Sequence, residues 1–340
     1  MNKLSTLFLA LLTLGSCTVY KEFPVDIYKP GEAEIPGDVK KVALVYRNFR
    51  YDNDTLKHYY RDNHLLKKAK GDPRNLDSLL ATICLNEAAI TLKKNYENKE
   101  FLIFSDVFKP HSAAKIPQLN PTVLAGLAET TKTDYIILLE THSYFYSEYK
   151  DDEGGPSPRQ VITADVWSAF DPSIQKFRDR KTMIDTVFWN AYKDDGTLDR
   201  SSKLPPRLTA LKIASQMAGE KYAKRYTASW ANTKRIYSVP PLPDFEAAEK
   251  YVQKGEWDNA IMLWRRYTGN KDGKLAINAR YNMAFAYEMQ DDLDSALQWL
   301  SSARKMAEDY HNRENLKMID EYRKILLQRQ KDIERLNQEQ

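Results

Sequence analysis

Residues 134–144, with the sequence DYIILLETHSY, form the most apolar strand-like stretch of the chain, and they decide its fold. A run of aliphatic residues without polar alternation is typical of a strand that is buried on both faces of a parallel sheet. The pattern therefore predicts a central strand over residues 134–144.

The segments around this strand alternate between strand and helix patterns. A buried-type strand is predicted over residues 39–46, from VKKVALVY. The pair Asn120-Pro121 is typical of a helix N-cap with proline in the first turn. The other predicted elements are a helix over 75–96, a strand over 101–104, a helix from 120 to 131, strands over 160–170 and 182–192, and a helix over 204–230. The order β-α-β-α-β-β-β-α predicts parallel pairing with right-handed crossovers first, followed by an antiparallel meander.

The C-terminal region shows an internal repeat. GEWDNAIMLW at 255–264 and DDLDSALQWL at 291–300 share small and aromatic positions 36 residues apart. This pattern is typical of tetratricopeptide repeats, whose usual period is 34 residues. The residues expected to pack the repeats are Gly255, Trp257, Ala260, Trp264, Ala284, Tyr287, Ala296, Leu300 and Ala303.

The predicted fold class is an α+β protein: an α/β sandwich with a mixed sheet, followed by an all-α tetratricopeptide-repeat domain. The expected divisions are a signal peptide at 1–16, a lipidated cysteine and tether at 17–38, an α/β envelope domain at 39–232, a proline-rich linker at 233–244, and repeats with a capping helix at 245–340.

The first seventeen residues indicate where in the cell the protein is located. Lys3 precedes eleven mostly apolar residues at 4–14, which is too short a run to span a bilayer and is typical of a signal peptide. Leu14-Gly-Ser-Cys17 is similar to a bacterial lipobox, in which the cysteine becomes the lipidated N-terminus. We expect anchorage through Cys17 to the outer membrane of a Gram-negative bacterium, on the periplasmic face because no acidic run follows the cysteine. The alternative is an ordinary secretory signal with a chance cysteine.

Composition excludes several classes of protein. The chain has 51 basic and 47 acidic residues, a net charge of +4, which gives no support for nucleic-acid binding. Two cysteines exclude a disulfide framework. Cys84 lies in an apolar helical stretch and is expected to be a buried, inert thiol.

Few residues point to catalysis. There is no nucleophile elbow, phosphate loop or dinucleotide fingerprint, and His58 and His64 have no further metal ligands nearby in the sequence. Glu140 and His142 lie two residues apart on the central strand and would share a face. They form either a proton relay or a hydrogen-bonded strand pair.

A second arrangement that could act in catalysis is Asp165 with Asp185, on neighbouring strands. They form either a carboxylate pair or two solvent-facing residues. We expect no enzyme activity, no cofactor and no metal.

Two surfaces are candidates for binding. Residues 48–72 are predicted to be a charged loop insertion, and exposed tyrosine and arginine are typical of protein interfaces. The candidate interface residues are Arg50, Tyr51, Tyr59, Tyr60 and Arg61, the alternative being a solvated loop. The aromatic run at 144–149 could stack a sugar or simply widen the end of the sheet.

The pattern of residues 39–230, with Val42-Ala-Leu-Val45, a strand followed by Ser105-Asp106, and the strand at 134–144, resembles a group of envelope domains. The group includes the amino-terminal domain of TolB, the curli-secretion channel lipoprotein and the lipoprotein activators of penicillin-binding proteins. With the lipobox and the repeats, the whole chain resembles a family of Bacteroidetes lipoproteins.

The resemblance implies a membrane-anchored, non-enzymatic scaffold or adaptor. Its partner would be an envelope protein, such as a cell-wall synthase or an assembly machine. One alternative is a subunit of an envelope secretion channel, which would need amphipathic hairpins that residues 48–72 and 107–120 do not show. The other alternative is an enzyme that acts on envelope glycans.

Overall fold

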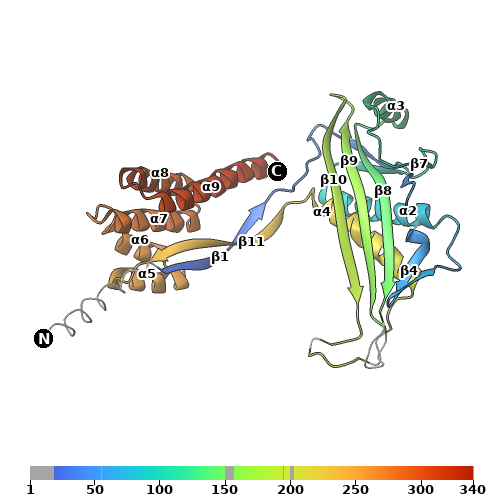
Figure 1. Ribbon diagram of the computed structural model, residues 1–340. Helices are drawn as coiled ribbons and strands as arrows, with labels where there is room; N and C mark the ends of the chain where they lie inside the picture. Colours follow the sequence, from blue (N-terminus) through green and yellow to red (C-terminus); the bar gives the residue numbers. More distant parts are fainter. Residues whose placement is uncertain (1–18, 55, 150–156, 194, 200–202, 340) are drawn as a thin grey trace. The chain divides into compact units, whose positions relative to one another are not determined.

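The computed structural model describes residues 19–54, 56–149, 157–193, 195–199 and 203–339. They form two compact units, each described by itself (Figure 1). The α/β unit is Gly31–Thr227. The helical unit combines the residues up to Pro30 with Ala228–Gln340, so the α/β unit is an insertion in its sequence. The signal-peptide and lipidation predictions fall on residues outside the described ranges.

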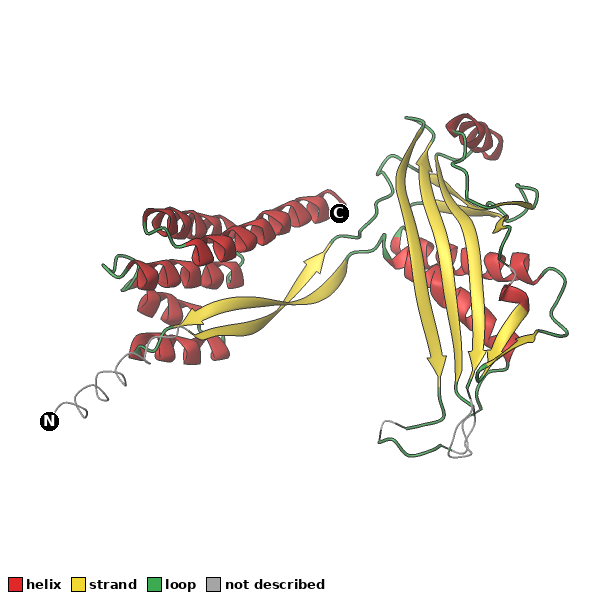
Figure 2. Cartoon of the chain, viewed as in Figure 1, coloured by secondary structure: helices red, strands yellow, loops and turns green. Residues whose placement is uncertain are grey.

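The α/β unit is built on a mixed sheet with the order β10-β9-β8-β2-β6 (Figure 2). The strands are β2 (Lys41–Tyr46), β6 (Glu100–Phe104), β8 (Tyr135–Glu148), β9 (Arg159–Asp171) and β10 (Lys176–Trp189). β2 pairs in parallel with β6 and β8, and β8, β9 and β10 form an antiparallel meander. The predicted mixed sheet and its central strand are confirmed.

Three helices cover the two faces of this sheet. They are α2 (Leu76–Asn95), α3 (Pro121–Thr131) and α4 (Arg207–Lys224). α2 and α4 pack together on the face that carries Ile137, Leu139 and Trp167, whereas α3 covers the face of Ile136 and Leu138. The N-cap of α3 is the predicted one, because the Asn120 side chain accepts from the Thr122 amide at 2.9 Å.

A β-bulge divides β8 into two halves. The pairing of β8 with β9 shifts between Leu139 and Thr141. Before the bulge, Ile137 and Leu139 face α2 and α4; after it, Tyr144 and Tyr146 pack with α4 residues. A bulge adds one residue to a strand and so exchanges its faces. Side chains that alternate in sequence therefore do not share a face across this point.

Residues 48–72 are more ordered than the predicted loop. They contain β3 (Phe49–Tyr51), the short helix η1 (Leu56–His58), and a hairpin of β4 (Tyr59–Asp62) and β5 (Leu65–Lys68). β3 pairs in parallel with β7 (His111–Ala113). β4 extends the main sheet by pairing in parallel with the end of β8. The sequence pattern does not reveal this arrangement, because each of these strands has only three or four residues.

The helical unit contains a two-stranded ribbon that the sequence did not predict. β1 (Val19–Lys29) pairs antiparallel with β11 (Ser229–Val239) along all eleven residues. Half of the expected tether at 17–38 is therefore a strand, and so is the first half of the expected linker at 233–244. The physical reason is long-range pairing: each strand satisfies the backbone groups of a partner about two hundred residues away.

Five helices follow the ribbon: α5 (Pro243–Lys254), α6 (Trp257–Arg265), α7 (Gly273–Met289), α8 (Leu293–Asp309) and α9 (Arg313–Glu339). Each helix packs against the next one in the chain. The predicted helical C-terminal region is thus confirmed. Within the described residues, no helix is long and apolar enough to cross a bilayer.

Candidate functional site

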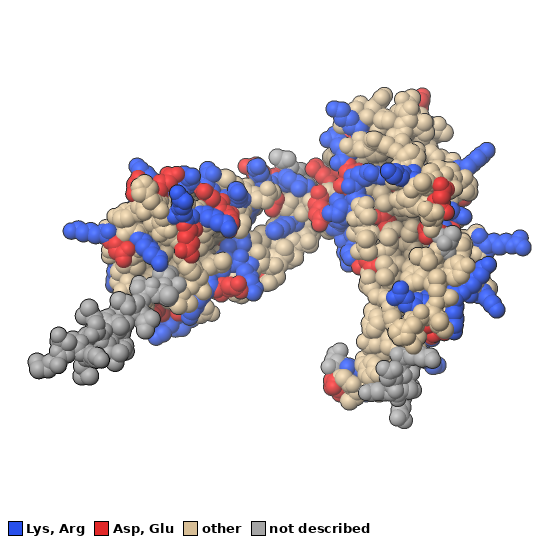
Figure 3. Space-filling view, in the orientation of Figure 1, with Lys and Arg blue, Asp and Glu red and all other residues tan. Residues whose placement is uncertain are grey.

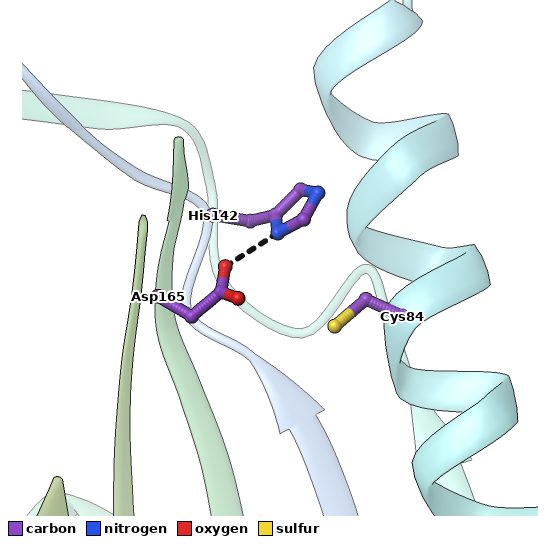
Figure 4. A group of neighbouring side chains, drawn as sticks. All are labelled: Cys84, His142 and Asp165. Carbon is purple, nitrogen blue, oxygen red and sulfur yellow. Dashed lines mark hydrogen bonds and ion pairs between the residues drawn. The ribbon is translucent and has the colours of Figure 1, made fainter. Parts of the chain in front are cut away.

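A buried polar cluster lies between the sheet and α2 and α4. His142 on β8 makes two hydrogen bonds, one between Nδ1 and Asp165 Oδ1 at 2.6 Å and one between Nε2 and Ser215 Oγ at 2.9 Å. Cys84 on α2 points its sulfur toward the same place (Figure 4). No sequence pattern pointed to Ser215, because it sits 73 residues from His142 in an ordinary helical stretch.

The order of serine, histidine and aspartate in this cluster is that of a catalytic triad, but the serine hydroxyl is enclosed in the core. The Ser215 hydroxyl donates to the carbonyl of Leu211, one turn earlier in α4, at 2.9 Å. The same hydroxyl lies 2.9 Å from His142 Nε2, and a serine nucleophile must be open to its substrate. Ser215 is fully buried and His142 and Asp165 almost so. The cluster ties the sheet to α4.

Cys84, His142 and Asp165 are also the one group of three metal-type ligands among the described residues. Burial, and then the negative charge of Asp165, raises the pKa of the Cys84 thiol well above its usual range. A protonated thiol is not a metal ligand. The Nδ1 of His142 is already hydrogen-bonded to Asp165, so the three groups are better described as core polar groups.

Glu140 does not face His142, contrary to the prediction. It lies in the bulge of β8 and accepts from Arg47 Nη1 at 2.7 Å and from Arg180 Nε at 3.0 Å. Arg47 and Glu140 are buried. A relay between Glu140 and His142 is therefore excluded, because the bulge gives the two side chains different neighbours.

Asp165 and Asp185 do not form a carboxylate pair either. In the antiparallel pairing of β9 with β10, Asp165 lies opposite Met183 and Asp185 lies opposite Thr163. Asp185 accepts instead from Lys221 on α4 at 2.7 Å. Each carboxylate thus has its own partner, which is His142 for Asp165 and Lys221 for Asp185.

The predicted interface residues of segment 48–72 make contacts within that segment, with α2 and with β8. Arg50 pairs with Asp77 of α2 at 3.2 Å. Tyr51 packs on the edge of Phe49 at 5.2 Å between ring centroids. Tyr60 packs against Tyr146 at 6.2 Å, and the Arg61 guanidinium lies 5.9 Å from the ring of Phe145. Tyr59 lies opposite Lys68 in the hairpin.

The outer strand of this hairpin is exposed. Among the described strands, β5 pairs with β4 alone, so it is an edge of the sheet. Leu65 is 64% exposed and Leu66 is 53% exposed. These leucines, which the sequence analysis did not single out, form the apolar part of the hairpin surface.

A groove of about 820 Å³ opens beside the hairpin, between the ends of β8 and β9 and the start of α4. Five basic side chains, two carboxylates and two tyrosines line it. The residues are Tyr60, Lys67, Lys68, Ala69, Lys70, Gly71, Asp72, Tyr146, Glu148, Arg159, Pro206, Arg207 and Leu208.

In the helical unit, the small residues expected at the helix crossings are all fully buried: Ala260, Ala284, Ala296 and Ala303. Trp264 and Leu300 are buried as well, whereas Trp257 and Tyr287 are partly buried. Gly255 ends α5 with φ of 72°, a conformation that favours glycine.

The ribbon packs against the helices of this unit. Asn282 of α7 forms two hydrogen bonds with the backbone of Ser238, at 2.8 and 2.7 Å. The ring of Tyr237 stacks on Phe285 with centroids 5.4 Å apart. Phe23 of β1 packs on the edges of Trp257 and Phe285.

A buried carboxylate joins ribbon and helices. Glu288 of α7 is fully buried and accepts from Arg235 of β11 at 2.8 Å. It also accepts from Arg329 at 3.0 Å and from the Tyr322 hydroxyl, both on α9. Burial lowers the pKa of Arg235, but the bond to Glu288 outweighs it and the net shift is upward. These four side chains connect β11, α7 and α9, which are distant in the sequence.

Comparison with known proteins gives family-level information. No curated protein matches the chain. The PelC dodecamer from Paraburkholderia phytofirmans is 11% identical, covers 62% of this chain and 100% of its own, and has a TM-score of 0.26. Protein XCC0632 from Xanthomonas campestris is 10% identical, covers 56% and 85%, and has a TM-score of 0.24. Residues 246–328 match a model described as Domain of unknown function (DUF6340). Residues 39–238, more than half of the chain, match the model described as Domain of unknown function (DUF8603), and the chain therefore belongs to that family.

Proposed function

We propose that the protein is a non-enzymatic scaffold in which the helical unit is a base and the α/β unit carries the binding surfaces. The observation that carries the proposal is the ribbon. Strands β1 and β11 continue directly into the two ends of the α/β unit at Gly31 and Thr227, and the ribbon is fixed to the helices through Arg235 and Glu288. The unit that holds both ends of an inserted domain acts as its support.

We further propose that the helices are two tetratricopeptide repeats with a capping helix. The period of 36 residues and the burial of Ala260 and Ala296 support this. Such arrays offer an inner helical face to peptides. Here the ribbon packs on α7 and α5, so part of that surface is occupied by the chain itself. We therefore place partner binding on the α/β unit rather than on the repeats.

Anchorage through Cys17 stays part of the proposal. β1 begins at Val19, two residues after the cysteine, and two extended residues span at most about 7 Å. A lipid on Cys17 would therefore hold the helical unit next to the membrane surface rather than on a long tether. In a cell-fractionation experiment, a Cys17→Ala variant should no longer be found in the membrane fraction.

The contact surface that we propose for a partner is the outer hairpin strand β5. An edge strand presents unpaired backbone groups, and an extended segment of another protein can add to it. Leu65 and Leu66 supply exposed apolar side chains on this strand. The proposed partner is an envelope protein that adds a strand here.

The test is the native mass of the detergent-extracted protein, with the co-purifying chains identified. We expect a stoichiometric partner with the wild type and its loss from a Leu65→Lys, Leu66→Lys variant. Val123→Lys is the matched control, because Val123 on α3 is also apolar and 51% exposed. A bare monomer in the wild type, or a partner that the hairpin variant retains, would contradict the proposal. A large ring of identical chains would favour the channel alternative.

A further inference from the structure

We propose that the groove beside the β4–β5 hairpin binds an acidic saccharide through a carboxylate or phosphate oxygen. This site shares Lys67 and Lys68 with the strand β5 that we propose as the protein contact, but its ligand is a small molecule that enters the groove. Three features of the groove point to an oxyanion: the unpartnered hydroxyl of a tyrosine whose ring is buried, an uncapped helix start and an excess of basic side chains.

The hydroxyl belongs to Tyr146. This tyrosine is only 2% exposed, yet its hydroxyl has no hydrogen-bond partner among the described residues, and it lines the groove. Burial, and then the charge of Glu148, raises the pKa of Tyr146 to about 12, so the group is a donor at neutral pH. An acceptor on a ligand in the groove would give this free donor a partner.

The helix start is that of α4. Its first residue is Arg207, and its N-cap is Pro206, which has no side-chain acceptor for the first amides. The first N–H groups of a helix lack intrahelical partners and carry a partial positive charge. Pro206, Arg207 and Leu208 all line the groove, so this end of α4 forms part of its wall. Helix N-termini of this kind bind anions.

The charge of the lining is positive. Lys67, Lys68, Lys70, Arg159 and Arg207 face two carboxylates, a difference of three charges. The carboxylates are already engaged, Asp72 with Arg207 and Glu148 with Arg159.

Two of these basic residues stay available to a ligand. Lys68 and Lys70 are exposed and have no partner within the part of the chain that the structure describes. Figure 3 shows basic side chains gathered on the side of the α/β unit that carries β4. An anion entering the groove would meet these two lysines.

The aromatic lining narrows the class of ligand. The ring of Tyr60 is partly buried in the groove wall and packs against Tyr146. Aromatic rings pack on the apolar C–H face of a pyranose, whereas a bare inorganic anion gains nothing from them. A volume of about 820 Å³ lies in the range of small-molecule sites. An aromatic wall beside oxyanion donors therefore fits a sugar that carries an acidic group.

The experiment measures binding to the full chain by titration calorimetry. The three probes are a uronic-acid disaccharide, the neutral disaccharide of the same linkage, and inorganic phosphate. We expect the acidic disaccharide to bind at least tenfold more tightly than either of the other probes. Tyr146→Phe removes only the unpartnered hydroxyl and should weaken binding about tenfold, as expected for a hydrogen bond to a charged group. Lys68→Ala with Lys70→Ala should weaken binding and reduce its dependence on salt.

The matched control is Lys93→Ala with Lys94→Ala, which removes the same charge from the exposed end of α2 and should leave the affinity unchanged. Equal affinity for the neutral disaccharide, or no effect of Tyr146→Phe, would overturn the proposal. Phosphate that binds as tightly as the acidic disaccharide would overturn its saccharide part. The Leu65→Lys, Leu66→Lys variant distinguishes the two proposals, because loss of a protein partner there does not depend on sugar binding.

Discussion

At the scale of single residues, Glu288 has the largest expected effect in the helical unit. Its carboxylate is fully buried and compensates Arg235, which is 3% exposed in its side chain. Removing one partner of a buried ion pair leaves an uncompensated charge and typically costs about 3–5 kcal/mol. We therefore expect Glu288→Gln to lower the free energy of unfolding of the helical unit by several kcal/mol, measured by denaturant titration.

Asp291→Asn is the control for this prediction. Asp291 pairs with the same Arg329 that contacts Glu288, but its side chain is 81% exposed. Exposed ion pairs contribute about 0–1 kcal/mol. The two variants should thus differ clearly, and equal effects would mean that the buried network is not what holds the ribbon to the helices.

Asp77 sets an acid dependence for the α/β unit. Burial raises the pKa of this carboxyl, but the bonds from Lys57 and Tyr144 and the charge of Arg50 outweigh burial and hold the pKa below its usual range. A depressed pKa stabilises the folded state above the unfolded value of about 3.9, and this contribution is lost as the pH falls through the folded value.

We therefore expect the stability of the α/β unit to fall on acidification below about pH 4–5, following the unfolded pKa. Asp77→Asn should be less stable at pH 7 and show a flatter pH profile. Unfolding curves at several pH values measure both effects. Asp52→Asn, which changes an exposed carboxyl nearby, should keep the wild-type profile. Parallel profiles for wild type and Asp77→Asn would contradict the prediction.

At the scale of elements, the contact of α2 with α4 depends on Gly219. A methyl group added there would lie 2.0 Å from the carbonyl oxygen of Cys84. Neither backbone can move without disturbing the helix crossing, and overpacking of this kind costs about 1–3 kcal/mol or more. We expect Gly219→Ala to lower the melting temperature of the α/β unit, measured by calorimetry.

Gly126→Ala on α3 is the matched control. No described atom outside its own helix backbone lies within 4 Å of the added methyl group, and alanine is favoured over glycine in a helix by about 1 kcal/mol. This variant should be neutral or stabilising. If both glycine variants were equally destabilised, the close crossing at Gly219 would not be the cause of the lost stability.

The elements also show what the sequence could and could not predict. Local patterns were sufficient for β2, α2, α3 and the meander, because burial periodicity and the Asn120 cap are local. The bulge of β8 was not predictable, because it depends on how Glu140 meets Arg47 and Arg180. That one extra residue made the expected pairing of Glu140 with His142 wrong.

At the scale of the whole molecule, the ribbon was missed for a different reason. β1 carries Pro24, which argues against a strand, and its partner lies beyond the entire α/β unit. Only a contact across that distance identifies it as a strand. The groove was missed for the same reason. Tyr146, Arg159 and Arg207 come from three different elements, and local sequence patterns do not show that these elements meet.

The discontinuous helical unit leads to a prediction about the whole chain. Phe23 precedes the α/β unit in sequence, yet it packs between Trp257 and Phe285 of the helical unit. Truncating a large aromatic side chain in such a contact costs about 3 kcal/mol. In calorimetry of the full chain, Phe23→Ala should lower the transition that Glu288→Gln lowers and leave unchanged the one that Gly219→Ala lowers. If Phe23→Ala instead lowered the transition that Gly219→Ala lowers, β1 would stabilise the α/β unit that follows it in sequence. The helical unit would then not be the support of the inserted domain.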